Sequence, residues 1–136
     1  MATDGGDRVQ AVHDRHMQVH QHHIEAELEA GATYVIAEAR ESGNVGIYRG
    51  TGEVREGLVQ EILTQIPHEK ILWEAPQKSQ QVWFIKLLGA NVNLGNIAPS
   101  EVIPLETIRL GLRGDTFSHF LNLEPSKPGI AAQKLD

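Results

Sequence analysis

The chain has 136 residues, of which 40% are hydrophobic and 22% charged, with a net charge of −6 and no cysteine. This length supplies one hydrophobic core and excludes two ordinary domains, and the absence of a run of about 20 apolar residues excludes a transmembrane helix. An acidic chain without Lys or Arg clusters interleaved with aromatic residues argues against nucleic-acid binding. Because no disulfide can form and the first residues lack the apolar segment of a secretory signal, we expect a cytoplasmic protein.

The first third of the chain predicts a tail, a helix and a strand. Residues 1–8 are small or charged, which predicts disorder. No glycine or proline interrupts residues 9–30, and apolar or histidine side chains recur at every fourth position, so we predict a helix that Gly31 terminates. Residues 33–37 (TYVIA) are β-branched or aromatic without alternation, which is typical of a parallel strand covered on both faces.

A glycine-rich segment, residues 42–52, then predicts a mobile loop over the end of the sheet. Residues 53–66 carry apolar side chains at helical spacing, and Pro67 follows them, so this segment is predicted to be an amphipathic helix. A strand is predicted at 70–74, and a helix that runs to Leu88 follows it.

The last predicted strand is 92–97, and Pro104 suits the first turn of a final helix that extends through Leu112. The order is therefore one helix followed by three βα units, an α/β fold with a parallel sheet. We expect one domain at residues 9–117 and a C-terminal tail at 118–136.

Polar side chains follow each predicted strand. Because the C-terminal ends of parallel strands lie on one edge of a sheet, these side chains are expected to converge there, where α/β proteins commonly carry their chemistry. They are Glu38, Arg40, Glu74, Gln77, Lys78, Asn93 and Asn96. A three-stranded parallel sheet would also leave two unpaired edges, so we expect either a homo-oligomer formed through those edges or a piece of a larger closed sheet.

Four segments, in this order and at this spacing, closely resemble the C-terminal part of phosphosulfolactate synthases, which are (β/α)8 barrels. The segments are 34–43 (YVIAEARESG), 73–82 (WEAPQKSQQV), 91–97 (NVNLGNI) and 102–116 (VIPLETIRLGLRGDT). The resemblance covers residues 24–117 and implies a partial TIM barrel containing strands six to eight. We expect residues 1–23 to fall outside it, and strands one to five to have no counterpart.

The resemblance implies Mg²⁺-dependent addition of sulfite to phosphoenolpyruvate, giving 2-phospho-3-sulfolactate, a reaction of coenzyme M biosynthesis. A lysine proposed to serve that reaction lies on an earlier barrel strand, outside the part that this sequence resembles. Hard cations prefer oxygen ligands, so Glu38 and Glu74 are the candidate Mg²⁺ ligands and, with Lys78, the candidate catalytic residues. The candidate substrate-binding residues are Arg40, Gln77, Asn93, Asn96 and Arg113.

Structural roles compete with these assignments. Either carboxylate could instead form a salt bridge with Arg40 or Lys78, and the asparagines could serve turns. Arg109 lies within the last predicted helix, where a surface or oligomer contact is the simpler role. Two functional hypotheses therefore stand, a truncated synthase whose activity depends on assembling a barrel-like site, and a non-catalytic self-assembling module derived from that barrel.

Four histidines recur along one side of the first predicted helix, at spacings of three, four and three. They are His13, His16, His20 and His23. Imidazoles four residues apart on a helix can chelate Zn²⁺ or Ni²⁺. Because no acidic or cysteine partner stands at ligand spacing, a polar helix face or appended sequence is the alternative to a metal-linked oligomer.

Overall fold

The computed structural model describes residues 23–40 and 42–121. Of the helix predicted at 9–30, residues 23–29 are helical, and Gly31 follows with a positive φ of 104°, as expected for a glycine that terminates a helix. Residues 9–22 of that predicted helix, the predicted tail 1–8, and residues 122–136 of the C-terminal tail predicted at 118–136 lie outside the described residues. Among the described residues, no helix has the length and apolar character to cross a membrane.

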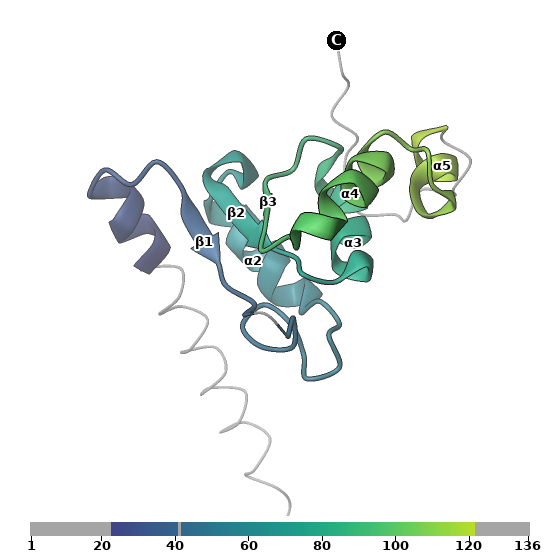
Figure 1. Cartoon of the computed structure of the whole chain (residues 1–136). Coiled ribbons are helices and arrows are strands. Elements are labelled where there is room, and N and C mark those ends of the chain that lie inside the picture. The colour runs from purple at the N-terminus through teal and green to yellow at the C-terminus, as the bar shows by residue number, and fades with distance from the viewer. Residues whose placement is uncertain (1–22, 41, 122–136) are drawn as a thin grey trace, which may run out of the picture.

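Three short parallel strands form one sheet in the order β1-β2-β3 (Figure 1). Strand β1 spans Val35–Ala37, β2 spans Ile71–Glu74 and β3 spans Leu94–Gly95. In the pairing of the first two strands, Ala37 lies opposite Trp73. The predicted parallel three-stranded sheet is confirmed.

The third strand is shorter than the predicted 92–97, for two local reasons. The backbone N–H of Val92 donates to the carbonyl of Gly89 at 3.3 Å, so Val92 belongs to the turn after the preceding helix. At the other end, Asn96 has a φ of 56°, which takes the backbone out of the extended conformation.

Helices α2 (Glu56–Gln65) and α3 (Lys78–Leu88) pack against one face of the sheet. The rings of Trp73 and Phe84 stack with their centroids 4.9 Å apart, which joins β2 to α3. The core shared by these elements includes Val35, Ala37, Val59, Ile62, Ile71, Trp73, Phe84 and Ile85. Helix α2 begins three residues later than predicted because Val54 pairs in an antiparallel bridge with Tyr48.

The opposite face of the sheet is open at β1 among the described residues. Ile36, between the buried Val35 and Ala37, is 61% exposed, and Tyr34 is 59% exposed. The prediction that β1 is covered on both faces is therefore wrong for this part of the chain, because both helices that follow β1 and β2 pack into the same core.

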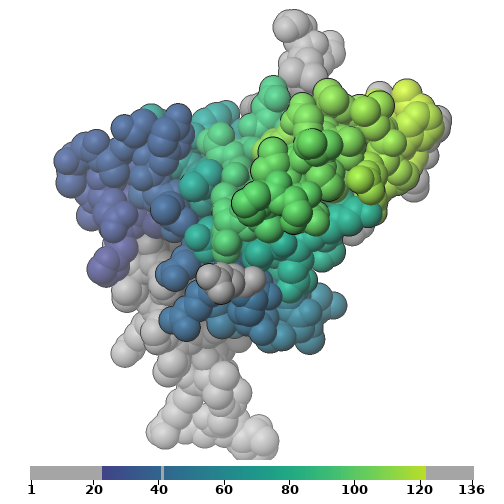
Figure 2. Space-filling model, in the orientation of Figure 1, coloured from purple at the N-terminus to yellow at the C-terminus, as the bar shows by residue number. Residues whose placement is uncertain are grey.

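Two further helices follow β3, α4 (Val102–Arg109) and α5 (Gly114–Phe120). Pro104 lies in the first turn of α4, as predicted. The helix ends earlier than expected because Gly111, with a φ of 69°, turns the chain into α5. Helix α5 was not predicted, and it includes residues 118–120, which were assigned to a tail. In Figures 1 and 2, α5 (yellow-green) lies at the opposite end of the described residues from the helix at 23–29 (purple).

Candidate functional site

Two glutamates occupy neighbouring positions where β1 and β2 end. Glu38 follows Ala37 and Glu74 follows Trp73, and since Ala37 and Trp73 are paired, the two glutamates are neighbours across strands about 4.8 Å apart. One oxygen of Glu74, Oε2, accepts the backbone N–H of Ala39 at 2.7 Å. The carboxylate of Glu74 is therefore fixed against the chain that leaves β1.

The loops after β1 and β3 meet above the end of β2. The side-chain amide of Asn96 donates to the carbonyl of Arg40 at 3.0 Å, and the N–H of Arg40 donates to Glu74 Oε2 at 3.2 Å. Arg40 and Asn96 both have a φ of 56°, a conformation that costs an arginine more than an asparagine. Backbone strain of this kind is common at functional sites, where surrounding contacts maintain it.

Tyr48 joins this arrangement, although its sequence position gave no functional signal beyond a glycine-rich neighbourhood. Its fully buried hydroxyl donates to the carbonyl of Glu74 at 2.6 Å. Burial raises the pKa of Tyr48, and the negative charge of Glu74 raises it further, so the hydroxyl remains a protonated donor. A Cβ on Gly46 would lie 2.0 Å from the carbonyl oxygen of Glu38, so the loop approaches β1 as closely as only a glycine permits.

Two glutamines at the start of α3 hold the 42–52 loop in place. Gln77 Nε2 donates to the carbonyl of Ser42 at 3.0 Å. The buried Gln80 donates through Nε2 to the carbonyls of Gly43, at 2.7 Å, and Gly52, at 2.9 Å. Sequence reasoning identified Gln77 but missed Gln80, because a glutamine inside a helix gives no sign that its partners are 28 and 37 residues away.

We call Glu38, Arg40, Glu74, Gln77 and Asn96 the rim. The structure brings these five predicted residues together where the strands end.

Asn93 does not join the rim. Its amide donates to the carbonyl of Glu69 at 3.0 Å, and Glu69 precedes β2. The expected convergence therefore fails for Asn93, which lies toward the start of β2 rather than its end.

The two remaining cationic residues of the predicted site, Lys78 and Arg113, interact with residues of the C-terminal helices. Lys78 forms a salt bridge with Asp115 of α5, with Nζ and Oδ2 2.8 Å apart. The hydrogen bond from Lys78 lowers the pKa of Asp115, and the positive charge of Arg113 contributes further. Arg113 itself donates through Nε to the hydroxyl of Thr107 at 2.9 Å. Arg109, for which a surface or oligomer contact was the simpler role, is instead partly buried and donates to the carbonyl of Ala90 within the chain.

The described residues contain no group of three or more His, Asp or Glu side chains able to hold a metal ion. His13, His16 and His20 of the histidine stripe lie outside the described residues. Glu38 and Glu74 fit a hard cation in another way, because Mg²⁺ is commonly held by one or two carboxylates together with water and substrate oxygens. Oε1 of Glu74 has no hydrogen bond among the described residues and is available for that role.

Comparison with known proteins matches the chain to one family. The family model for (2R)-phospho-3-sulfolactate synthase matches residues 6–115, so the resemblance begins earlier than the expected residue 24. The phosphosulfolactate synthase of Methanothermobacter thermautotrophicus is 56% identical over 94 residues, which are 68% of this chain and 36% of that protein. The synthase of Methanocaldococcus jannaschii is 53% identical over 95 residues, 69% of this chain and 38% of that protein.

A bacterial relative shows the same pattern. The phosphosulfolactate synthase of Bacillus subtilis is 49% identical over 96 residues, which are 70% of this chain and 38% of that protein. The chain thus spans less than two fifths of the length of each of these relatives.

Proposed function

Because this chain belongs to the (2R)-phospho-3-sulfolactate synthase family, we propose that its rim takes part in Mg²⁺-dependent addition of sulfite to phosphoenolpyruvate, giving 2-phospho-3-sulfolactate. The observation that carries the proposal is the placement of Glu38 and Glu74 at neighbouring strand ends, with the Glu74 carboxylate fixed by the backbone of the loop that Asn96 joins at Arg40. Because the chain covers part of its relatives, the proposed activity is that of a truncated form or of an assembly that completes the barrel.

The chemistry of this addition defines what the site must supply. The sulfur lone pair of sulfite forms a bond to the methylene carbon of phosphoenolpyruvate, and the electrons of the C=C bond move onto the carboxylate to form an enediolate. A proton then adds to the carbon that bears the phosphate. The site must therefore stabilise a developing dianion next to two further anionic groups and deliver one proton.

The rim residues have the chemistry that this step requires. When bound by Glu38 and Glu74, Mg²⁺ would supply positive charge for the enediolate. Arg40 offers a bidentate guanidinium to phosphate or carboxylate, and Asn96 and Gln77 offer amide donors. Each of these two amides already donates to a loop carbonyl, so in the present arrangement they position the loops rather than reach into an open site.

The proposal also includes residues outside the rim. Lys78 is the proposed proton donor, and it must first leave Asp115, with which it forms a half-exposed surface pair of small stability. Arg113 would bind phosphate from the start of α5, and its present bond to Thr107 is exposed. Asn93 remains the weakest member of the proposed substrate-binding set, because its amide faces Glu69. We place this activity in the cytoplasm, in line with the composition.

A self-assembling module is the second proposal, favoured by two observations. Ile36 and Tyr34 are more than half exposed on the face of β1 that no described element covers, and the outer edges of β1 and β3 have no partner strand among the described residues. Both features favour a homo-oligomer in which copies cover each other's sheets. Light scattering coupled to size-exclusion chromatography tests this, because a stable monomer at high concentration would refute it.

The catalytic proposal is tested with the full 136-residue protein, magnesium, phosphoenolpyruvate and sulfite, with mass spectrometric detection of 2-phospho-3-sulfolactate. The proposal predicts product that depends on magnesium and is lost in Glu74→Gln, whereas Glu106→Gln on the exposed side of α4 retains it. Phosphoenolpyruvate binding without any sulfonate product would refute catalysis by this chain and leave a binding role.

A further inference from the structure

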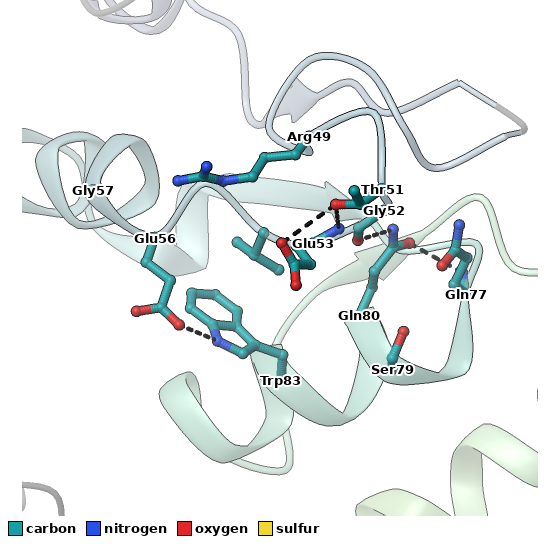
Figure 3. Close-up of a pocket in the computed structure, with 11 residues that line it drawn as sticks. Arg49, Thr51, Gly52, Glu53, Glu56, Gly57, Gln77, Ser79, Gln80 and Trp83 are labelled. Carbon is teal, nitrogen blue, oxygen red and sulfur yellow. Dashed lines mark hydrogen bonds between the residues drawn. The ribbon is translucent and has the colours of Figure 1, made fainter.

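A pocket lies beside the rim, between the beginnings of α2 and α3 (Figure 3). Its volume is ≈ 560 Å³, within the range of about 300–1,000 Å³ that is usual for small-molecule sites. Residues 49–57 form one wall and residues 77–83 the other. Apart from Gln77, no residue of the rim lines it, so it is a distinct pocket.

One side of the pocket is acidic and aromatic. Glu56, at the start of α2, accepts the indole N–H of Trp83 at 3.2 Å, which holds the carboxylate at the edge of the ring. The carboxylate of Glu53 lies between Thr51 and Trp83 in Figure 3. Its only hydrogen bond among the described residues is the one it accepts from the hydroxyl of Thr51, at 3.3 Å. An ammonium group is attracted both by carboxylates and by the face of a tryptophan ring, so this side of the pocket suits such a group.

The pocket also carries an uncommitted positive group. The side chain of Arg49 extends along the pocket, and its guanidinium forms no ion pair or hydrogen bond with the described residues (Figure 3). Although Glu53 and Glu56 line the same pocket, no salt bridge joins either of them to Arg49 among the described residues. Opposite charges thus face one cavity without neutralising each other, and the arrangement suits a ligand that carries both signs.

We propose that this pocket binds a small zwitterion of amino-acid size, with its ammonium group against Glu53, Glu56 and Trp83 and its carboxylate against Arg49. The two carboxylates outnumber the single guanidinium, which disfavours a multiply charged anion such as phosphoenolpyruvate here. An occupant would contact Gln77 and Gln80, the residues that hold the 42–52 loop over the rim. The pocket is therefore placed to stabilise that loop when it is filled.

The test is isothermal titration calorimetry on the full chain with three probes of equal length, 5-aminopentanoate, pentylamine and pentanoate, without magnesium, phosphoenolpyruvate or sulfite. We expect 5-aminopentanoate to bind with a Kd in the millimolar range or tighter, and pentylamine to bind about tenfold more weakly, since one charge-assisted contact is lost. Pentanoate should give no binding. Because no substrate is present, the outcome is independent of the proposed synthase activity.

Two variants and a matched control locate the binding. Arg49→Gln should reduce the affinity for 5-aminopentanoate about tenfold and leave that for pentylamine unchanged, whereas Glu53→Gln should weaken both. The control, Glu61→Gln, also removes one negative charge, from a position in α2 that does not line the pocket, and should change the affinity for neither 5-aminopentanoate nor pentylamine. Circular dichroism checks that all three variants are folded. Absence of heat with every probe, equal binding of pentanoate, or unchanged affinities in both pocket variants would overturn the proposal.

Discussion

Replacing Gln80 with methionine tests whether one buried side chain holds the 42–52 loop over the rim. Methionine has a similar length and is apolar, so the change removes hydrogen bonds while leaving little cavity. Three bonds are lost, from Nε2 to the carbonyls of Gly43 and Gly52 and from the N–H of Gln77 to Oε1, the last at 3.1 Å. Each backbone group left buried without a partner costs about 1–3 kcal/mol.

The expected loss of stability for Gln80→Met is below the sum of those terms, because the loop can open and let water reach the freed carbonyls. We expect about 2–4 kcal/mol in the free energy of unfolding, a large fraction of the 5–15 kcal/mol typical of a domain. Urea denaturation followed by tryptophan fluorescence measures it, and hydrogen exchange should show faster exchange in residues 42–52. The control is Gln60→Met, on the exposed side of α2, which should change stability by less than about 0.5 kcal/mol. A change as small in Gln80→Met as in the control would refute the role assigned to Gln80.

Three further substitutions probe two contacts at the rim and one between α3 and α5. Tyr48→Phe removes the hydroxyl donor to the Glu74 carbonyl and should cost about 1–2 kcal/mol in urea denaturation, whereas Tyr34→Phe at an exposed position should cost nothing measurable. Gly46→Ala should lower the free energy of unfolding by at least about 2 kcal/mol, because the new Cβ would meet the Glu38 carbonyl and the residue has a positive φ. The control, Gly50→Ala, places its Cβ within 4 Å of no atom and should be tolerated. Equal stabilities of the two variants would contradict the close approach at Gly46. The lowered pKa of Asp115 means that its pair with Lys78 contributes stability above the ordinary aspartate pKa of about 3.9 and loses it as the pH falls below that value. Because the pair is partly exposed, Asp115→Asn should remove at most about 1 kcal/mol at pH 7, and a pH-dependence of unfolding below pH 4 that is identical in the variant would exclude this contribution.

The parallel sheet and its rim were predictable because they depend on local patterns. Apolar runs followed by a charged residue marked the ends of β1 and β2, and strand order then fixed that Glu38 and Glu74 lie side by side. The amphipathic spacing of α2 and the proline in the first turn of α4 are equally local signals. Features of the fold that depend on a short stretch of chain were therefore predictable from the sequence of that stretch.

The missed features depend on contacts between distant segments. Helix α5 is stabilised by the buried Thr116, whose hydroxyl donates to the carbonyl of Ile108 at 2.6 Å, and by the pair of Lys78 with Asp115. A short segment with glycine at its start shows no helical pattern of its own. Asn93 was predicted to join the rim together with Asn96, but it precedes β3 and its amide donates to the carbonyl of Glu69, before β2.

Tyr48 and Gln80 were missed for a related reason. Each makes its decisive hydrogen bond to a backbone carbonyl at least 26 residues away, which no sequence spacing reveals. The glycines at 43, 46 and 52 did carry a signal, since all three have positive φ and lie against a side chain or carbonyl. Glycine-rich composition was taken to indicate mobility, whereas here it permits close approach.

The central claim is that Glu38 and Glu74 act together as an acidic pair that binds magnesium with phosphoenolpyruvate. Calorimetric titration of phosphoenolpyruvate into the full chain, with and without magnesium, tests it most directly. We predict binding that requires magnesium and that weakens at least about tenfold in both Glu38→Gln and Glu74→Gln but not in Glu106→Gln. Binding that is independent of magnesium, or equally tight in all three variants, would contradict it.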